Sequence, residues 1–291
     1  MRERLFPRWG AALFALLPMS EILYMPVNGQ TLYAAALASL ICALVCAGGA
    51  RLAPLFQRSR MLQWLLALGA LWPLTHSLAR MGVFLRDTVF VNRPVWSLIL
   101  LLTACTMLTA TAGLNRCAMW ALPTAWLAGS VIVLSGVLTI TQLHLSYWQA
   151  PDASLPAQVW DILSVLLPTS LVLSLSLPEP LAGAASRGLA AGGALFALIS
   201  LRTSLLLGVH TAALLHYPNF SAAGLASIGD FARHGEVFFA VPLLLCELGR
   251  CAALACVLLL PVTHTYGVLH LPTRPDKVKQ KKRADGRPRK Q

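Results

Sequence analysis

Ionisable side chains inside long apolar runs are the residues of this sequence whose types could do chemistry. They are Glu21, Arg80, Arg202, Glu247 and Arg250. A charged group surrounded by lipid is costly, so it tends to face a cavity or a partner of opposite charge. The chemistry open to such groups is solute binding, gating or proton coupling, or a structural ion pair.

Glu21 lies in "LLPMSEILYMP", between Pro18 and Pro26. A proline inside a helix removes one backbone hydrogen bond and clashes with the preceding turn, so we expect a break near Met19, Ser20 and Glu21. One interpretation is a kink with a partly hydrated Glu21 near the membrane interface. The other is a discontinuous helix whose open backbone groups line a substrate site.

A second proline interrupts "ILSVLLPTSLVLSLSLPEP", where Pro168, Thr169 and Ser170 stand in the middle of an apolar run. Small hydroxyl residues can bond to carbonyls that a proline leaves free. They are also common where membrane helices pack closely. If both runs are interrupted, the ligand site comprises Met19, Ser20, Glu21, Pro168, Thr169 and Ser170.

The other ionisable residues have simpler interpretations. Arg80 lies near the end of its run and could extend to the interface. Arg202 lies in mid-run, so we expect it to pair with a carboxylate or with carbonyls. Glu247 and Arg250 are three residues apart on one helix and are expected to pair with each other.

These residues must be positioned by membrane-spanning helices. The chain has 291 residues, of which 57% are hydrophobic and 12% charged, and its mean hydropathy is +0.68. Its apolar runs reach the roughly 20 residues needed to cross a bilayer, and alternating β-barrel segments are absent. We therefore predict an all-α integral membrane protein with eight spans, at residues 9–28, 31–49, 61–84, 94–112, 117–141, 157–177, 187–212 and 234–262.

Positive charge gives the orientation, since the formal net charge of +12 is concentrated in alternate connections. Arginines before span one, between spans two and three, and in "RPDKVKQKKRADGRPRK" fall on one side of the membrane. The positive-inside rule then places both termini in the cytoplasm. We divide the chain into a transmembrane domain, 1–262, and a basic tail, 263–291, expected to be disordered and to anchor the chain at anionic lipid rather than to bind nucleic acid.

No motif predicts an enzyme. There is no GxSxG, P-loop, HExxH or strand-linked GxGxxG pattern, and the seven cysteines show no zinc spacing. Buried cysteine is usually a small apolar residue in packing. We therefore expect no catalytic residue, no metal and no cofactor.

The stretch "YPNFSAAGLASIGDFARHGEVFFAVPLLL" resembles the region around the eighth span of the spore germination permeases, the B subunits of nutrient germinant receptors. Tyr217, Pro218, Gly229, Phe231 and Glu236 match in order and spacing. "ILYMPVNG", "LSLPE" at 175–179 and "RPVWSLILLLTACTMLTATAGLNRCAMWALP", with Pro94, Gly113 and Arg116, are similar to other parts of that family, so the resemblance covers about residues 9–262.

This resemblance implies the ten-span, inverted-repeat fold of the amino acid–polyamine–organocation superfamily, here shortened by its last two spans. It implies a ligand site between spans one and six, at the six residues given above. It implies a nutrient sensor, for an amino acid in particular, in the inner membrane of a bacterial spore, with receptor A and C subunits as partners. Glu21 departs from the family's small residues at this position.

Two alternatives to the sensor remain: an active permease for amino acids or other small solutes, and a shortened paralogue with only a structural role. Asp230 and Glu236 stand where the last span begins. Glu236 either caps this helix through its dipole or forms an ion pair with Arg202 or Arg233. Arg202, Arg233, Glu236, Glu247 and Arg250 are thus our candidates for coupling or structural ion pairs.

Overall fold

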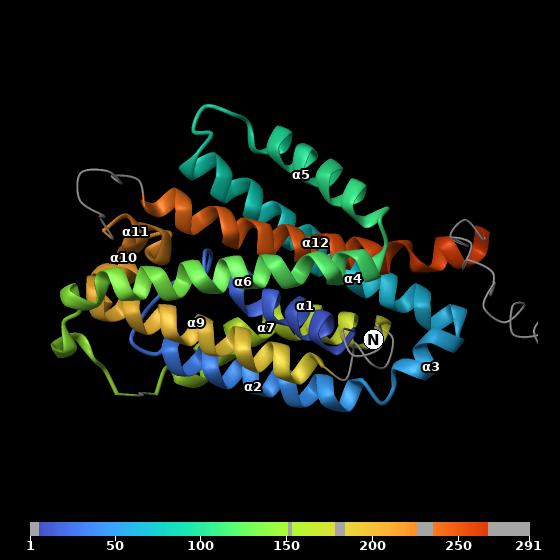
Figure 1. Cartoon of the computed structure of the whole chain (residues 1–291), viewed down its shortest axis with the longest axis horizontal. Coiled ribbons are helices and arrows are strands. Elements are labelled where there is room, and N and C mark those ends of the chain that lie inside the picture. The colour runs from blue at the N-terminus through green and yellow to red at the C-terminus, as the bar shows by residue number, and fades with distance from the viewer. Residues whose placement is uncertain (1–5, 151–152, 178–183, 226–234, 267–291) are drawn as a thin grey trace, which may run out of the picture.

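The computed structural model describes residues 6–150, 153–177, 184–225 and 235–266, and every regular element in these ranges is a helix (Figure 1). The long helices are α1 (Phe6–Glu21), α2 (Thr31–Gly49), α4 (Arg60–Thr88), α5 (Val95–Ala110), α6 (Leu114–Thr139), α7 (Leu155–Ser176), α9 (Ala185–Leu207) and α12 (Gly235–Tyr266). The short ones are α3 (Ala53–Arg58), η1 (Ile140–Gln142), η2 (Leu145–Tyr147), α10 (Val209–Leu214) and α11 (Pro218–Gly224).

Each predicted span overlaps one of these long helices. Five segments of the described chain are long and apolar enough to cross a membrane: Thr31–Gly49, Arg116–Gln142, Leu155–Ser176, Ala185–Leu207 and Glu236–Pro261. The chain is thus an all-α protein with the helices of an integral membrane protein. The number of spans and the inverted-repeat fold stay predictions.

Helix α1 lies at the centre of the bundle. Every residue from Ala12 to Leu23 is buried, and α1 packs against α9, α6, α12 and α7. A helix that is apolar on all sides belongs in such an interior. Around it, α2 packs on α9 and α7, while α4 packs on α12, α5 and α7.

The crossing of α1 with α9 depends on glycine. A Cβ atom at Gly188 would overlap the carbonyl oxygen of Ala11, and one at Gly192 would overlap that of Ala15. Small residues let membrane helices approach each other closely, which is how helices associate when lipid is as apolar as their side chains. This close packing holds α1, and the residues at its end, in place.

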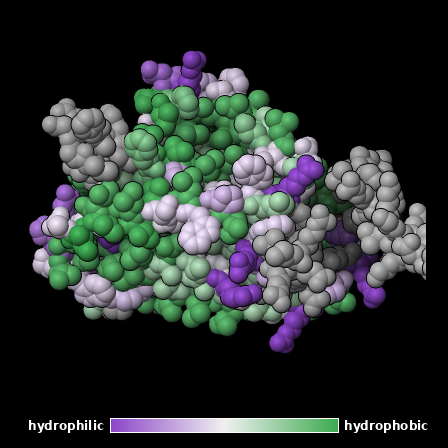
Figure 2. Space-filling model, viewed as in Figure 1, coloured by the Kyte–Doolittle hydropathy of each residue, from purple (hydrophilic) through white to green (hydrophobic). Residues whose placement is uncertain are grey.

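The outer surface suits lipid. Large apolar side chains such as Leu44, Trp72, Trp126 and Phe238 are exposed, and Figure 2 shows a face on which hydrophobic atoms predominate. Basic residues stand at the helix ends: Arg58 in the last turn of α3, Arg116 in the first turn of α6. Figure 1 places α3 at the same end of the bundle as the start of α1, with α10 and α11 at the opposite end.

Neither Pro18 nor Pro168 interrupts the helix that contains it. Helix α7 continues through Pro168, so the predicted break in this span is wrong. The hydroxyls of Thr169 and Ser170 donate to the carbonyls of Val165 (3.1 Å) and Leu167 (3.1 Å), as small hydroxyl residues do in membrane helices. Helix α1 also continues through Pro18, and it ends at Glu21, where a turn follows.

Part of the sequence prediction falls outside the described residues. This holds for Gly229, Asp230, Phe231 and Arg233, for Pro178 and Glu179 of "LSLPE", and for the basic tail from residue 267. Helix α11 begins at Pro218, directly after Tyr217. Proline is favoured at this first helical position because no N–H is needed there.

Candidate functional site

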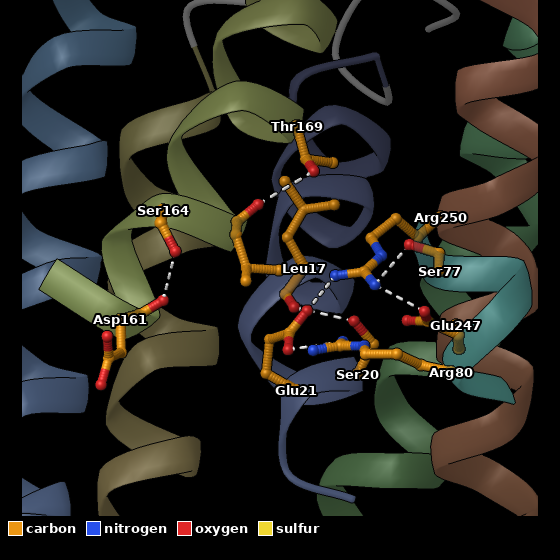
Figure 3. Close-up of polar contacts among 11 residues, drawn as sticks. Leu17, Ser20, Glu21, Ser77, Arg80, Asp161, Ser164, Thr169, Glu247 and Arg250 are labelled. Carbon is orange, nitrogen blue, oxygen red and sulfur yellow. Dashed lines mark hydrogen bonds and ion pairs between the residues drawn. The ribbon is translucent and has the colours of Figure 1, made fainter. Parts of the chain in front are cut away.

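A cluster of buried charges lies where α1, α4 and α12 meet (Figure 3). Glu21, the last residue of α1, is fully buried and receives two arginines. Arg80 of α4 donates from Nη2 to Glu21 Oε2 at 2.6 Å, and Nη1 of Arg250 on α12 donates to Glu21 Oε1. Arg250 also donates from Nη2 to Glu247 and to the Ser77 hydroxyl at 2.7 Å.

The predicted pair of Glu247 and Arg250 is confirmed, but the expectation for Arg80 is wrong. Its side chain is only 19% exposed and turns inward, because the buried Glu21 carboxylate attracts it more strongly than the interface. Ser77 and Arg80 are three residues apart, so they share one face of α4. The stretch "THSLAR" at 75–80 carries this pattern, and Ser77 was nevertheless missed as a site residue.

The cluster, defined here as Glu21, Arg80, Glu247 and Arg250, is balanced in formal charge, with two carboxylates and two guanidinium groups. This balance permits its burial, since an uncompensated charge there would be strongly destabilising. Its hydrogen-bonding capacity is not filled by the described residues. Arg80 Nε, Glu247 Oε2 and Arg250 Nε are buried and have no partner among them.

Aromatic rings cover the cluster on the α11 side. The Arg80 guanidinium lies 4.6 Å from the centroid of the Tyr24 ring, in cation–π geometry. Tyr24 meets Phe84 edge to face at 5.8 Å, and Phe84 in turn meets Tyr217 and Phe220 of the α11 region. The Tyr217 hydroxyl donates to Asp87 at 3.2 Å. The Tyr-Pro stretch thus closes this side of the cluster.

The polar residues of α11 also hold the end of α1. Asn219 is buried and donates from Nδ2 to the carbonyl of Ile22 at 2.6 Å, while its Oδ1 accepts from Thr203 of α9 at 2.7 Å. A helix end leaves carbonyls without internal partners, and a buried one must be satisfied by other groups. This contact fixes the turn that follows Glu21.

A cavity of about 160 Å³ lies between α4 and α7, next to the cluster. Its lining comprises Trp72, Pro73, His76, Ser77, Ser164, Val165, Pro168 and Thr169. Each wall carries a proline, and Pro168 cannot bond to the carbonyl of Ser164, four residues earlier. Three hydroxyls, an imidazole and apolar surface therefore meet in one small space, with Ser77 shared by the cavity and the cluster.

The six predicted ligand residues do not form one pocket. Pro168 and Thr169 line the cavity, and Glu21 belongs to the cluster behind it. Met19 and Ser20 are buried in α1, with the Ser20 hydroxyl bonded to the carbonyl of Leu17 at 2.8 Å. Ser170 is also buried but does not line the cavity. Trp72, His76 and Ser77 line it and were not predicted.

Arg202 forms a second buried polar site, nearer α11. Its Nε donates to the Thr139 hydroxyl at 2.9 Å, and its Nη2 donates to the carbonyl of Ala222 at 3.0 Å. No carboxylate pairs with it in the part of the chain that the structure describes. Of the alternatives from sequence, pairing with a carbonyl is thus confirmed. The proposed pairing with Glu236 is wrong, because the Arg202 guanidinium is directed to α6 and α11.

Among the described residues, no group of three or more His, Cys, Asp and Glu side chains is placed to hold a metal ion. No protein-family model matches this chain, and no curated protein or solved structure matches it.

Proposed function

We propose that this protein is a membrane subunit of a spore germinant receptor, which senses a small polar nutrient in the cavity between α4 and α7. One observation carries the proposal: Ser77 lines this cavity and also accepts a hydrogen bond from Arg250 of the charge cluster. A solute in the cavity is therefore separated by one side chain, that of Ser77, from Arg250, which links α1, α4 and α12. The resemblance to spore germination permeases supports the biological setting.

The size and lining of the cavity favour a solute of few atoms. A volume of about 160 Å³ is small beside the roughly 300–1,000 Å³ of drug-sized sites. Ser77, Ser164, Thr169 and His76 offer hydrogen bonds, while Trp72 and the two prolines offer apolar contact. A small amino acid suits this combination, because it brings polar groups and a short apolar side chain together.

Binding can be transmitted through the cluster. A solute that donates a hydrogen bond to Ser77 shares the acceptor oxygen with Arg250 Nη2. Any shift of Arg250 alters its contacts with Glu21 on α1 and Glu247 on α12. A ligand shifts a conformational equilibrium only through different contacts in the two states, and this shared hydroxyl provides such a difference.

In this proposal the protein lies in the inner membrane of the spore, with both termini in the cytoplasm. Receptor A and C subunits are its partners, and anionic lipid contacts its basic end. An amino-acid permease is the second candidate, favoured by the same polar cavity inside a helical bundle. Uptake of labelled amino acids into proteoliposomes separates the two, since only the permease accumulates solute.

Nutrient-triggered release of dipicolinate tests the proposal. We expect spores that lack the gene to lose their response to one nutrient of an amino-acid and sugar panel, and the wild-type gene to restore it. Thr169→Val removes a cavity hydroxyl at nearly constant volume and should weaken the restored response. Thr75→Val, whose hydroxyl bonds to carbonyls of its own helix at 2.9 and 3.0 Å outside the cavity, is the matched control. Equal responses in all strains would refute the sensor function.

A further inference from the structure

Two cysteines far apart in the sequence meet between α6 and α12. The sulfur atoms of Cys117 and Cys256 are 3.7 Å apart, and both residues are buried. Cys117 Sγ lies 3.8 Å from the carbonyl oxygen of Thr109, and Cys256 Sγ lies 3.4 Å from that of Ala110. Both thiols thus stand at the C-terminal end of α5, where the same two carbonyls also accept from the backbone N–H groups of Ala112 and Gly113.

Covalent bonding needs only a small movement from this arrangement. A disulfide joins sulfur atoms at about 2.05 Å, so the two must approach by roughly 1.7 Å. Rotation of the side chains covers such a distance when the helices already pack together, as α6 and α12 do. Cys42 and Cys46 differ, because they share helix α2 and no packing of separate helices brings them together.

One of the two sulfurs has a route to small reagents. A cavity of about 90 Å³ is lined by Cys117 with Arg116 and Trp120, in the first turns of α6. Cys256 does not line it. A small oxidant that enters this cavity therefore meets Cys117 first, and Cys256 lies directly behind it.

We propose that Cys117 and Cys256 are a redox-sensitive thiol pair that closes to a disulfide on reaction with a hydroperoxide. The Cys117 thiol gives up its proton, and the thiolate attacks the peroxide oxygen and breaks the O–O bond. This gives a sulfenic acid and a hydroxide or alkoxide, which takes up the released proton and leaves as water or an alcohol. The Cys256 sulfur then attacks the Cys117 sulfur, which forms the S–S bond and releases water. The two thiols lose two electrons and the peroxide gains them.

The disulfide would tie the helix that carries Glu247 and Arg250 to α6. Cys256 lies six residues after Arg250 on α12. Oxidation would also remove both S–H donors from the carbonyls at the end of α5. The position near the predicted cytoplasmic side agrees with a reversible bond, since cytosolic disulfides are usually transient or sensory.

The test uses the purified full-length protein in lipid nanodiscs. The protein is exposed to hydrogen peroxide and then unfolded, so that a maleimide can block all remaining thiols. Peptides from a non-reducing digest are identified by mass spectrometry. We expect the number of blocked thiols to fall by two and a linked peptide with Cys117 and Cys256 that is two hydrogen atoms lighter than its parts. A thiol reductant should reverse both changes.

Variants separate the roles of the two sulfurs. Cys256→Ser should leave Cys117 as a sulfenic acid that a dione probe captures, and Cys46→Ser, as the control, should form the linked peptide normally. The inference is overturned if wild-type protein keeps both thiols reactive, or if Cys117 oxidises while Cys256 stays free. These readouts do not depend on any nutrient, so their failure would leave the sensor proposal unaffected.

Discussion

Replacement of Glu21 by glutamine tests the charge cluster with little change in shape. The substitution leaves Arg80 and Arg250 with Glu247 as the remaining carboxylate of the cluster, so one positive charge in the bundle is uncompensated. Removal of one partner from a buried ion pair costs about 3–5 kcal/mol. Arg80 is 19% exposed and can recover some hydration, which places the expected loss near the lower value, about 3 kcal/mol.

A second substitution should restore part of this loss. Glu21→Gln with Arg80→Gln leaves the neutral pair of Glu247 and Arg250. Groups in one ion network usually couple by about 0.5–3 kcal/mol, so the double variant should be more stable than the sum of the single variants by about that amount. Asp87→Asn is the control, because its ion pair with Arg86 is exposed and should be worth under about 1 kcal/mol, and the amide oxygen can still accept from the Tyr217 hydroxyl.

The assay is reversible unfolding of the purified protein in mixed micelles, followed by circular dichroism against denaturant concentration. Free energies of unfolding for wild type, the two single variants, the double variant and Asp87→Asn complete the cycle. The reasoning is refuted if Glu21→Gln is as mild as Asp87→Asn, or if the effects of Glu21→Gln and Arg80→Gln simply add.

Three further predictions concern packing, a buried cation and pH. Gly192→Ala should lower the free energy of unfolding by about 1–3 kcal/mol, because its Cβ meets the Ala15 carbonyl. Gly136→Ala, with open space around it, should leave this free energy unchanged. Thermal unfolding of both variants decides between these outcomes. Thr139→Val removes the acceptor of Arg202 Nε and should lower the free energy of unfolding by about 1–3 kcal/mol. An unchanged midpoint of thermal unfolding would contradict the assigned contact. Burial, and then the Asp87 carboxylate, raises the pKa of Tyr217 to about 12. Since the folded-state pKa is above the unfolded value, the stability that this shift contributes is present below about pH 10 and is lost as the pH rises through about 12. Titration of tyrosinate absorbance should show one fewer late-ionising phenol in Tyr217→Phe, and an identical curve would contradict this pKa.

The positions of the long helices were predictable because each depends on the hydropathy of one continuous run of residues. All eight apolar runs became helices, and the pair of Glu247 and Arg250 followed from their spacing on α12. Long-range partners were not predictable in this way. Glu21 pairs with residues 59 and 229 positions away, and nothing in the local pattern of α4 shows that Arg80 turns inward.

Proline also proved a poor guide to the site. Pro168 predicted a break in its helix, yet α7 continues through it, and the hydroxyls of Thr169 and Ser170 bond to carbonyls other than that of Ser164. The proline instead helps to line a cavity whose other wall, at Trp72, His76 and Ser77, comes from α4. Which faces of two helices meet depends on the packing of the whole bundle, so a single run of sequence could not place this cavity.

Solute binding to the purified protein tests the central proposal most directly. Thermal unfolding in nanodiscs would be measured with a panel of amino acids and sugars, for wild type, Thr169→Val and Thr75→Val. A ligand that binds the folded state raises its unfolding temperature. We predict that one small polar solute stabilises wild type and Thr75→Val but has a much smaller effect on Thr169→Val. If no solute stabilises wild type, or if one stabilises Thr169→Val equally, the cavity between α4 and α7 is not a nutrient site.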